Sequence, residues 1–170
     1  MSVIVFRTER LLVRRLCSAD LAAMHTVYGD ADAMKWVGDG KPITYEGCAK
    51  WIEVTQKNYD LRGYGMFAVE RISVPGVIGF CGLVHPNNQL VAELKYAYNR
   101  LFWGMGFATE AAKGLIEYAA VAHKLVHITA TTDPANSASH QVLIKAGLKR
   151  GELLREEDGS YTQIFYWSAS

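Results

Sequence analysis

The stretch "WGMGFATEA", residues 103–111, places two glycines directly before a run that favours helix. Glycine inside a helix costs about 1 kcal/mol relative to alanine, so Gly104 and Gly106 need a reason to stand here. One reason is a sharp turn that packs the helix against a sheet. The other is a ligand that approaches the bare backbone, because the first N–H groups of a helix lack internal partners and attract anions. The residues alone leave both interpretations open.

Two familiar phosphate-binding motifs do not fit this stretch. A P-loop needs a lysine followed by serine or threonine after its glycines, and no such pair follows Gly106. The dinucleotide fingerprint needs a third glycine where this sequence has Thr109. Both motifs are excluded, which leaves an anion cradle of another kind or a simple turn.

The sequence on either side predicts a mixture of strands and helices. Short β-branched and aromatic runs bounded by Pro, Gly and Asn predict strands, and apolar residues three or four apart predict helices. The expected strands are residues 10–16, 66–71, 76–84, 90–98, 126–132, 151–157 and 161–167. The expected helices begin at Ser18, at Thr44, at the quoted stretch and at Asn136. The second of these helices is expected to bury one face, made of Cys48, Trp51, Ile52, Thr55 and Tyr59.

The order of these elements predicts the fold class. Three successive strands with short connections indicate an antiparallel meander, and the strand–helix–strand unit around the quoted stretch indicates one crossover. We therefore expect one domain, residues 1–170, of the α/β (α+β) class. Its core is a mixed, mainly antiparallel sheet of about seven strands flanked by about four helices.

The composition argues against several classes of protein. A net charge of +1 argues against nucleic acid as a partner. The three cysteines stand far apart without CxxC spacing, which predicts reduced thiols in a cytoplasmic protein rather than disulfides or a zinc site. The first residues lack the features of a signal peptide, and no apolar run approaches about 18 residues, so no membrane span is expected.

Three segments resemble the GNAT superfamily of N-acetyltransferases, and within it the branch that includes bacterial ribosomal-protein N-terminal acetyltransferases. They are "TERLLVRRLCSADLAAM" (8–24), "AELKYAYNRLFWGMGFATEAAKGLIEYA" (92–119) and "DPANSASHQVLIKAGLKRGELL" (133–154). The element order fits the superfamily over nearly the whole chain. The resemblance implies a GNAT-like fold and an enzyme that moves an acetyl group from acetyl-CoA, its co-substrate, directly to an amine.

The resemblance also implies where acetyl-CoA binds. The superfamily pattern Gln/Arg-x-x-Gly-x-Gly/Ala falls on Trp103, Gly106 and Ala108, with Trp103 departing from Gln or Arg. The CoA pyrophosphate would lie on backbone N–H groups of the turn, namely those of Met105, Gly106, Phe107, Ala108 and Thr109. In this superfamily the preceding strand splays from its neighbour and binds pantetheine. Its N–H donor to the thioester carbonyl matches Ala97, which Tyr96 and Tyr98 flank.

Glu93 matches a strand position at which some superfamily members carry the general base. A carboxylate there can take the proton of the amine directly or through a water. Two-residue alternation also places Lys95 on the same face, where an ion pair would explain both residues without catalysis. Such a pair would stabilise the charged carboxylate and weaken Glu93 as a base. Both interpretations stay open at this point.

The reaction also needs a group that donates a proton to the departing CoA thiolate. Many superfamily members use a tyrosine that aligns with Leu143, which cannot donate a proton. In the ribosomal-protein branch the serine of Asn-x-x-Ser is the substitute, and here it is Ser139. Asn136 is expected to cap its helix and, with Ser139, to contact the cofactor. A free thiol has a pKa near 8.5, so the thiolate can also leave without a strong acid.

The acceptor is an amine that the sequence does not specify: a protein N-terminus, a polyamine, an amino acid or an aminoglycoside-like compound. The first two helices and their loop form the acceptor wall in this fold, and Trp36 is expected to contact the acceptor. The five histidines lack metal-ligand spacing, so no metal is expected, and His140 should lie on a solvated helix face. Leu143 cannot donate a proton, and Lys95 can pair with Glu93 and weaken it as a base. The alternative to an enzyme is therefore a non-catalytic acyl-CoA-binding sensor or scaffold. Homodimers are common in families that resemble this one.

Overall fold

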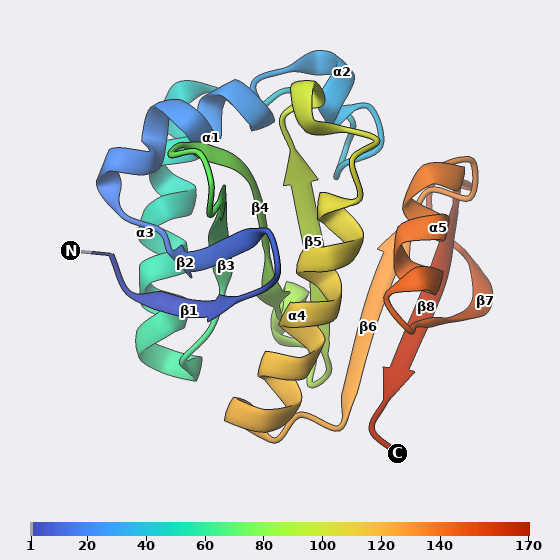
Figure 1. Ribbon diagram of the computed structural model, residues 1–170. Coiled ribbons are helices and arrows are strands. Elements are labelled where there is room, and N and C mark those ends of the chain that lie inside the picture. Colours follow the sequence, from blue (N-terminus) through green and yellow to red (C-terminus); the bar gives the residue numbers. More distant parts are fainter. Residues whose placement is uncertain (1) are drawn as a thin grey trace.

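A computed structural model describes residues 2–170 and contains one sheet with helices on both faces (Figure 1). The eight strands follow the order β1-β2-β3-β4-β5-β6-β8-β7. Neighbouring strands are antiparallel except for β5 and β6, which are parallel and joined through α4. The predicted class, a mixed and mainly antiparallel sheet with one crossover, is therefore confirmed.

The elements have the following bounds. The strands are β1 (Ile4–Arg7), β2 (Leu11–Arg15), β3 (Met66–Arg71), β4 (Val77–Val84), β5 (Ala92–Tyr98), β6 (His127–Thr132), β7 (Lys149–Arg155) and β8 (Tyr161–Ser168). The helices are α1 (Leu21–Tyr28), α2 (Ala31–Met34), α3 (Tyr45–Arg62), α4 (Phe107–His123) and α5 (Ser137–Lys145).

Two of these elements were missing from the sequence prediction. β1 is a four-residue edge strand that pairs only with β2, and α2 is a single turn capped by the Asp30 side chain. Elements this short carry too little periodicity to be recognised in a sequence. Ser18, expected to cap α1, instead begins a short 3-10 turn, and Asp20 precedes the helix.

The sheet separates two apolar cores. One core packs α4 and α5 against the sheet through residues such as Leu115 and Leu143. The other packs α1 and α3 against the opposite face through residues such as Val27 and Ile52. Figure 1 shows α4 in front of the strands, α3 behind them and α1 along their upper edge. No helix within residues 2–170 is long and apolar enough to cross a membrane.

Helix α3 buries a narrower stripe than predicted. Thr44 caps it as expected, because the Thr44 hydroxyl accepts a hydrogen bond from the Gly47 N–H (3.0 Å). The buried residues are Cys48, Ile52, Thr55 and Tyr59. Trp51 was expected among them but is 45% exposed. The buried residues follow one another at steps of three and four positions. Because Ile52 belongs to this stripe, the residue before it, Trp51, points toward solvent.

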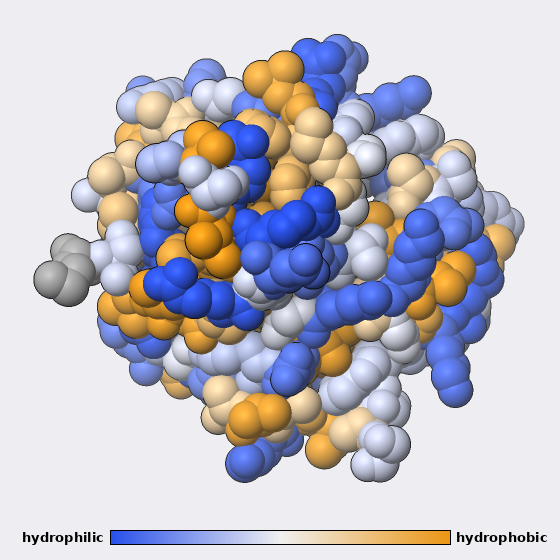
Figure 2. Space-filling model, in the orientation of Figure 1, coloured by the Kyte–Doolittle hydropathy of each residue, from blue (hydrophilic) through white to orange (hydrophobic). Residues whose placement is uncertain are grey.

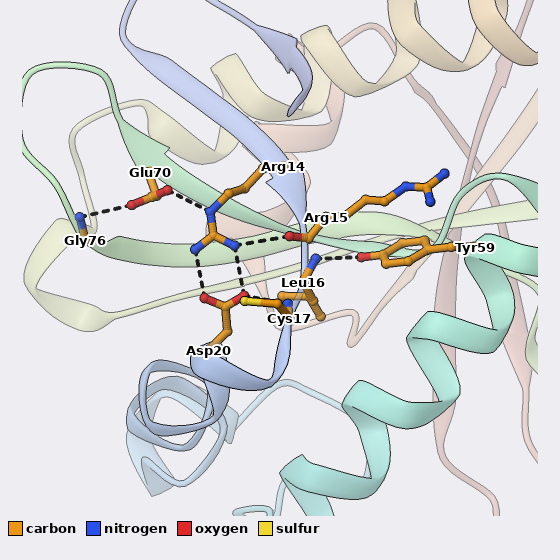
Figure 3. A network of polar contacts seen from close by, with 8 residues as sticks. All are labelled: Arg14, Arg15, Leu16, Cys17, Asp20, Tyr59, Glu70 and Gly76. Carbon is orange, nitrogen blue, oxygen red and sulfur yellow. Dashed lines mark hydrogen bonds and ion pairs between the residues drawn. The ribbon is translucent and has the colours of Figure 1, made fainter. Parts of the chain in front are cut away.

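A buried polar network ties β2 to α1 and β3 (Figure 3). The Arg14 guanidinium donates to both oxygens of Asp20 (2.7 and 2.9 Å) and to Glu70 (2.8 Å). The Tyr59 hydroxyl accepts from the Leu16 N–H (3.0 Å) and donates to the main chain of β3. Burial alone would raise the pKa of Asp20, but the hydrogen bonds from Arg14 lower it below its usual value. The network fixes the start of α1 beneath the sheet.

Candidate active site

The N-terminus of α4 is bare main chain. Gly104 and Gly106 have φ of 77° and 80°, the left-handed region that glycine adopts without steric cost. Gly106 is the N-cap residue, and it carries no side chain that could cap the helix. A Cβ built at Gly104 meets no atom of the described chain within 4 Å. The glycines therefore make a tight turn with open space beside Gly104, and the approach of a ligand to this turn stays a prediction.

Arg10 holds this turn in place, and sequence reasoning missed it. Its guanidinium donates to the Met105 carbonyl (2.9 Å) and to Glu110 Oε2 (2.6 Å), and it lies over the Phe107 ring at 4.5 Å. The Thr8 hydroxyl donates to Glu110 Oε1 (2.6 Å). Arg10 and Glu110 are 100 positions apart, so no spacing rule connects them.

The charge state of Glu110 suits it to hold the turn together with Arg10. Partial burial works to raise the pKa of its carboxyl, but hydrogen bonds from Thr8 and Arg10 outweigh burial and lower the pKa. The ionised carboxylate in the first helical turn also interacts favourably with the positive end of the helix dipole. Glu110 therefore joins the β1–β2 hairpin to the first turn of α4 at neutral pH.

A surface hollow of ≈ 370 Å³ adjoins the turn. Its lining residues are Glu9, Gly106, Thr109, Glu110, Lys113 and Lys145. Figure 2 shows hydrophilic side chains over the middle of this face, where β1, β2 and α4 meet, with hydrophobic surface in smaller areas. Lys113 and Lys145 add positive charge beside the N–H groups of the turn, while the lining also contains the carboxylates of Glu9 and of Glu110, the latter paired with Arg10.

Strands β5 and β6 pair over a short length and then separate. Their register contains Ala92 with Ile128 and Glu93 with Thr129, whereas β5 stays paired with β4 as far as Tyr98. Beyond Glu93 the described β5 residues have no pairing partner on β6, and an extended ligand can add along this edge as a strand would. This opening leads directly to the glycine turn, because Tyr98 ends β5 and accepts a hydrogen bond from the Trp103 indole (2.9 Å).

Alternation along β5 sends its side chains to opposite faces of the opening. Leu94 and Tyr98 belong to the core of α4 and α5, and Ala97 to the core of α1 and α3. Tyr96 packs with the first set, and Glu93 and Lys95 share the face of Ala97. The Tyr98 ring is buried, so Tyr98 presents its main chain rather than its side chain to the opening.

Glu93 is a buried carboxylate beside the opening. It is 5% exposed, and its Oε1 accepts from the Thr131 hydroxyl (2.6 Å) and lies 3.3 Å from Lys95 Nζ. The side chain of Lys95 is 47% exposed. The ion pair expected as the non-catalytic explanation is therefore present, but it leaves about half of the Lys95 side chain in solvent.

Two hydroxyl groups meet on the other face. Tyr96 of β5 and Ser139 of α5 hydrogen-bond to each other with an O···O distance of 2.5 Å. Burial raises the pKa of Tyr96 to about 12, partly offset by this hydrogen bond, so the phenol stays protonated at neutral pH. Asn136 caps α5 by accepting the Ser139 N–H (3.2 Å), and Leu143 is 1% exposed in the core.

Two other sequence candidates lie elsewhere. Trp36 follows α2, is 38% exposed and lies under the Lys35 ammonium at 4.9 Å, so its contact with an acceptor stays a prediction. The solvated position expected for His140 is wrong. Its ring is 6% exposed, hydrogen-bonds to Thr132 (2.8 Å) and packs on Phe165, because α5 turns this side toward the sheet.

The comparisons with known proteins agree with this geometry. A family model described as an acetyltransferase (GNAT) domain matches residues 10–149, and the chain belongs to this family of acetyltransferases. The Bacillus licheniformis protein named "Uncharacterized N-acetyltransferase p20" is 28% identical over 153 residues, which are 88% of this chain and 84% of that relative.

Solved structures share the fold. A GNAT-family acetyltransferase from Bacillus anthracis has a TM-score of 0.79 at 25% identity and covers 99% of this chain and 98% of its own. RimL, a ribosomal alpha-N-protein acetyltransferase solved in complex with coenzyme A, has a TM-score of 0.80 at 16% identity, with 99% and 98% coverage. At that identity the likeness to RimL shows the fold alone.

Proposed function

We propose that this acetyltransferase binds acetyl-CoA in the β5/β6 opening and transfers the acetyl group directly to an amine. One observation carries the proposal. The opening runs from a buried carboxylate, Glu93, past a hydroxyl pair, Tyr96 and Ser139, to the bare N-terminus of α4. Acetyl-CoA supplies an activated thioester, whose C–S bond breaks as the new C–N bond forms.

The main chain supplies the binding groups. N–H groups in the turn from Met105 to Thr109 fit a pyrophosphate, because Gly106 leaves them uncovered and Arg10 holds the turn. The free edge of β5 fits an extended pantetheine chain.

The Ala97 N–H, expected as the donor to the thioester carbonyl oxygen, faces Phe80 of β4, because the Asn99 N–H donates to Ile78 of β4 and N–H groups alternate sides along a strand. The N–H groups of Tyr96 and Tyr98 face the free edge and are our candidate donors to that oxygen. One such donor aimed at a developing oxyanion contributes about 3–4 kcal/mol in other enzymes.

Glu93 is our candidate general base. Thr131 and Lys95 both contact Oε1, and we assign the second carboxylate oxygen, Oε2, to the acceptor nitrogen. The proton that the nitrogen loses on bonding to the acetyl carbon goes to this oxygen, directly or through a water. Glu93 lies on the face of α1 and α3, the side from which the acceptor enters in this proposal.

Ser139 is our candidate hydrogen-bond donor to the sulfur, with Tyr96 as its positioning residue. The Tyr96 hydroxyl fixes the direction of the Ser139 hydroxyl across the opening. Ser139 donates a hydrogen bond to the departing thiolate, which takes its proton from solvent. A thiol pKa near 8.5 makes the thiolate a competent leaving group, so a hydrogen bond from Ser139 already assists its departure.

The location, domain organisation, oligomeric state and partners of the enzyme are proposals of the same kind. We place the enzyme in the cytoplasm as one domain that forms homodimers, without nucleic acid, membrane or metal as partner. The three cysteines are free thiols, and burial raises the pKa of Cys81 to about 12, which suits a reducing compartment. Sedimentation of the purified protein tests the dimer.

The test of the activity is thiol release from acetyl-CoA with a panel of amines. Peptides with free N-termini, polyamines, amino acids and an aminoglycoside form the panel, and Glu93→Gln and Ser139→Ala accompany the wild type. Release that depends on an amine, and that both substitutions slow at unchanged acetyl-CoA affinity, supports the proposal. Tight binding of acetyl-CoA without release for any amine would instead favour a non-catalytic acyl-CoA-binding module.

A further inference from the structure

We propose that Glu93 and Lys95 together select a free α-amino acid as the acceptor, with Lys95 binding its carboxylate while Glu93 takes its amine. This inference rests on the proposed function and names the acceptor class for the same site. It starts from a cation that the catalytic assignment does not use.

The exposure of the two side chains supports the division of roles. The Glu93 side chain is 7% exposed and held by Thr131, whereas the Lys95 side chain is 47% exposed. A pair that served the fold alone would gain little from an ammonium that is half in water, since exposed ion pairs contribute only about 0–1 kcal/mol. An exposed ammonium beside a buried carboxylate instead offers an anion a charged partner at the mouth of the site.

The two charged groups of the pair are neighbours, as the two charged groups of an α-amino acid are. Lys95 Nζ lies 3.3 Å from Glu93 Oε1. Standard bond lengths place the amino nitrogen of an amino acid about 2.5 Å from its carboxyl carbon. An amino acid can therefore set its nitrogen against Glu93 and its carboxylate against Lys95 in one pose, with each charge beside one of opposite sign.

The other acceptor classes match the pair less well. A peptide N-terminus or an amino acid amide has a neutral carbonyl where the amino acid has its carboxylate, so the charge-assisted hydrogen bond to Lys95 is lost. A polyamine or an aminoglycoside brings further positive charge toward Lys95. Hydrogen bonds to charged groups have a net worth that corresponds to a preference of roughly tenfold to a hundredfold.

The experiment compares matched acceptors. Thiol release from acetyl-CoA is measured for free amino acids, for the same amino acids as α-carboxamides, and for polyamines, with wild type and Lys95→Met. Lys57→Met, a change at an exposed lysine on α3, is the matched control. The quantity of interest is the ratio of kcat/KM for each amino acid to that for its carboxamide. Any effect of the substitution on Glu93 itself acts on both acceptors and cancels in this ratio.

The inference expects a wild-type ratio of at least ten that falls toward one in Lys95→Met and is unchanged in Lys57→Met. A wild-type ratio near one, or a ratio that Lys95→Met leaves intact, overturns it. Acetylation of amides, peptides or polyamines in preference to free amino acids overturns it while the proposed function stands. Absence of release with every acceptor overturns both.

Discussion

Substitution of Gly106 by alanine tests the cradle most directly. Gly106 has φ 80°, and the left-handed region costs an alanine roughly 1–2 kcal/mol. The new Cβ would lie 3.4 Å from Arg10 Nη2, a contact that a flexible side chain accommodates. The same methyl group would cover the N–H groups of the first turn of α4. We therefore expect a moderate loss of stability and a larger loss of affinity for CoA.

A matched control separates the loss of stability from the loss of CoA affinity. Gly159, in the β7–β8 turn, has φ 87° and no atom of the described chain within 4 Å of a Cβ built there. Gly159→Ala carries the same backbone penalty far from the cradle. For a chain of this size each kcal/mol lowers the melting temperature by roughly 2–4 °C, so both variants should melt roughly 2–8 °C below wild type.

Calorimetric titration with CoA distinguishes the two variants. Each hydrogen bond to a charged group has a net worth of about 1.5–3 kcal/mol, so the loss of one N–H contact in Gly106→Ala lowers the affinity roughly tenfold to a hundredfold. Gly159→Ala should bind CoA as wild type does. If Gly106→Ala binds CoA with wild-type affinity, the pyrophosphate does not lie on these N–H groups and the glycines serve the turn alone.

Three further outcomes follow from the polar contacts. Arg10→Met frees the Met105 carbonyl and Glu110, so CoA affinity should fall several-fold in calorimetry, while Lys57→Met should not change it. Tyr96→Phe should lower kcat more than it raises KM and change the pH profile of kcat, because the fold keeps the ring and loses only the hydroxyl; an unchanged profile would contradict the positioning role. Asp20→Asn should destabilise the fold by about 1.5–3 kcal/mol at pH 7 in urea unfolding, since Arg14 loses one of its two carboxylate partners and keeps Glu70.

The destabilisation expected for Asp20→Asn has a defined pH dependence. The folded-state pKa of Asp20 lies below its ordinary value of 3.8, so the unfolded chain binds the proton more readily. The stabilisation is fully present above about pH 5 and disappears as the pH falls through the folded-state pKa. The gap in unfolding free energy between wild type and Asp20→Asn should therefore narrow below pH 4. A gap that stays constant down to pH 2 would contradict the assignment.

Local signals in the sequence were sufficient for most of the elements. Thr44 and Asn136 cap the helices that they were expected to cap, since capping depends on atoms three residues apart. The alternation in β5 placed Glu93 and Lys95 together, and their ion pair is present. The residues that departed from expectation, Trp51 and His140, sit on helices whose exact rotation against the sheet no local pattern specifies.

The sequence by itself determined all the strands except β1, all the helices except α2, the glycine turn before α4 and the membership of a family with this element order. Only the tertiary structure decided that Arg10 holds the turn, that Tyr96 meets Ser139 and that β5 separates from β6 after two residue pairs. The physical reason is the separation along the sequence over which each effect acts. Propensity, capping and periodicity act over a few residues, whereas these contacts join positions 36 to 100 apart, and only the packing of the sheet and its helices brings such positions together.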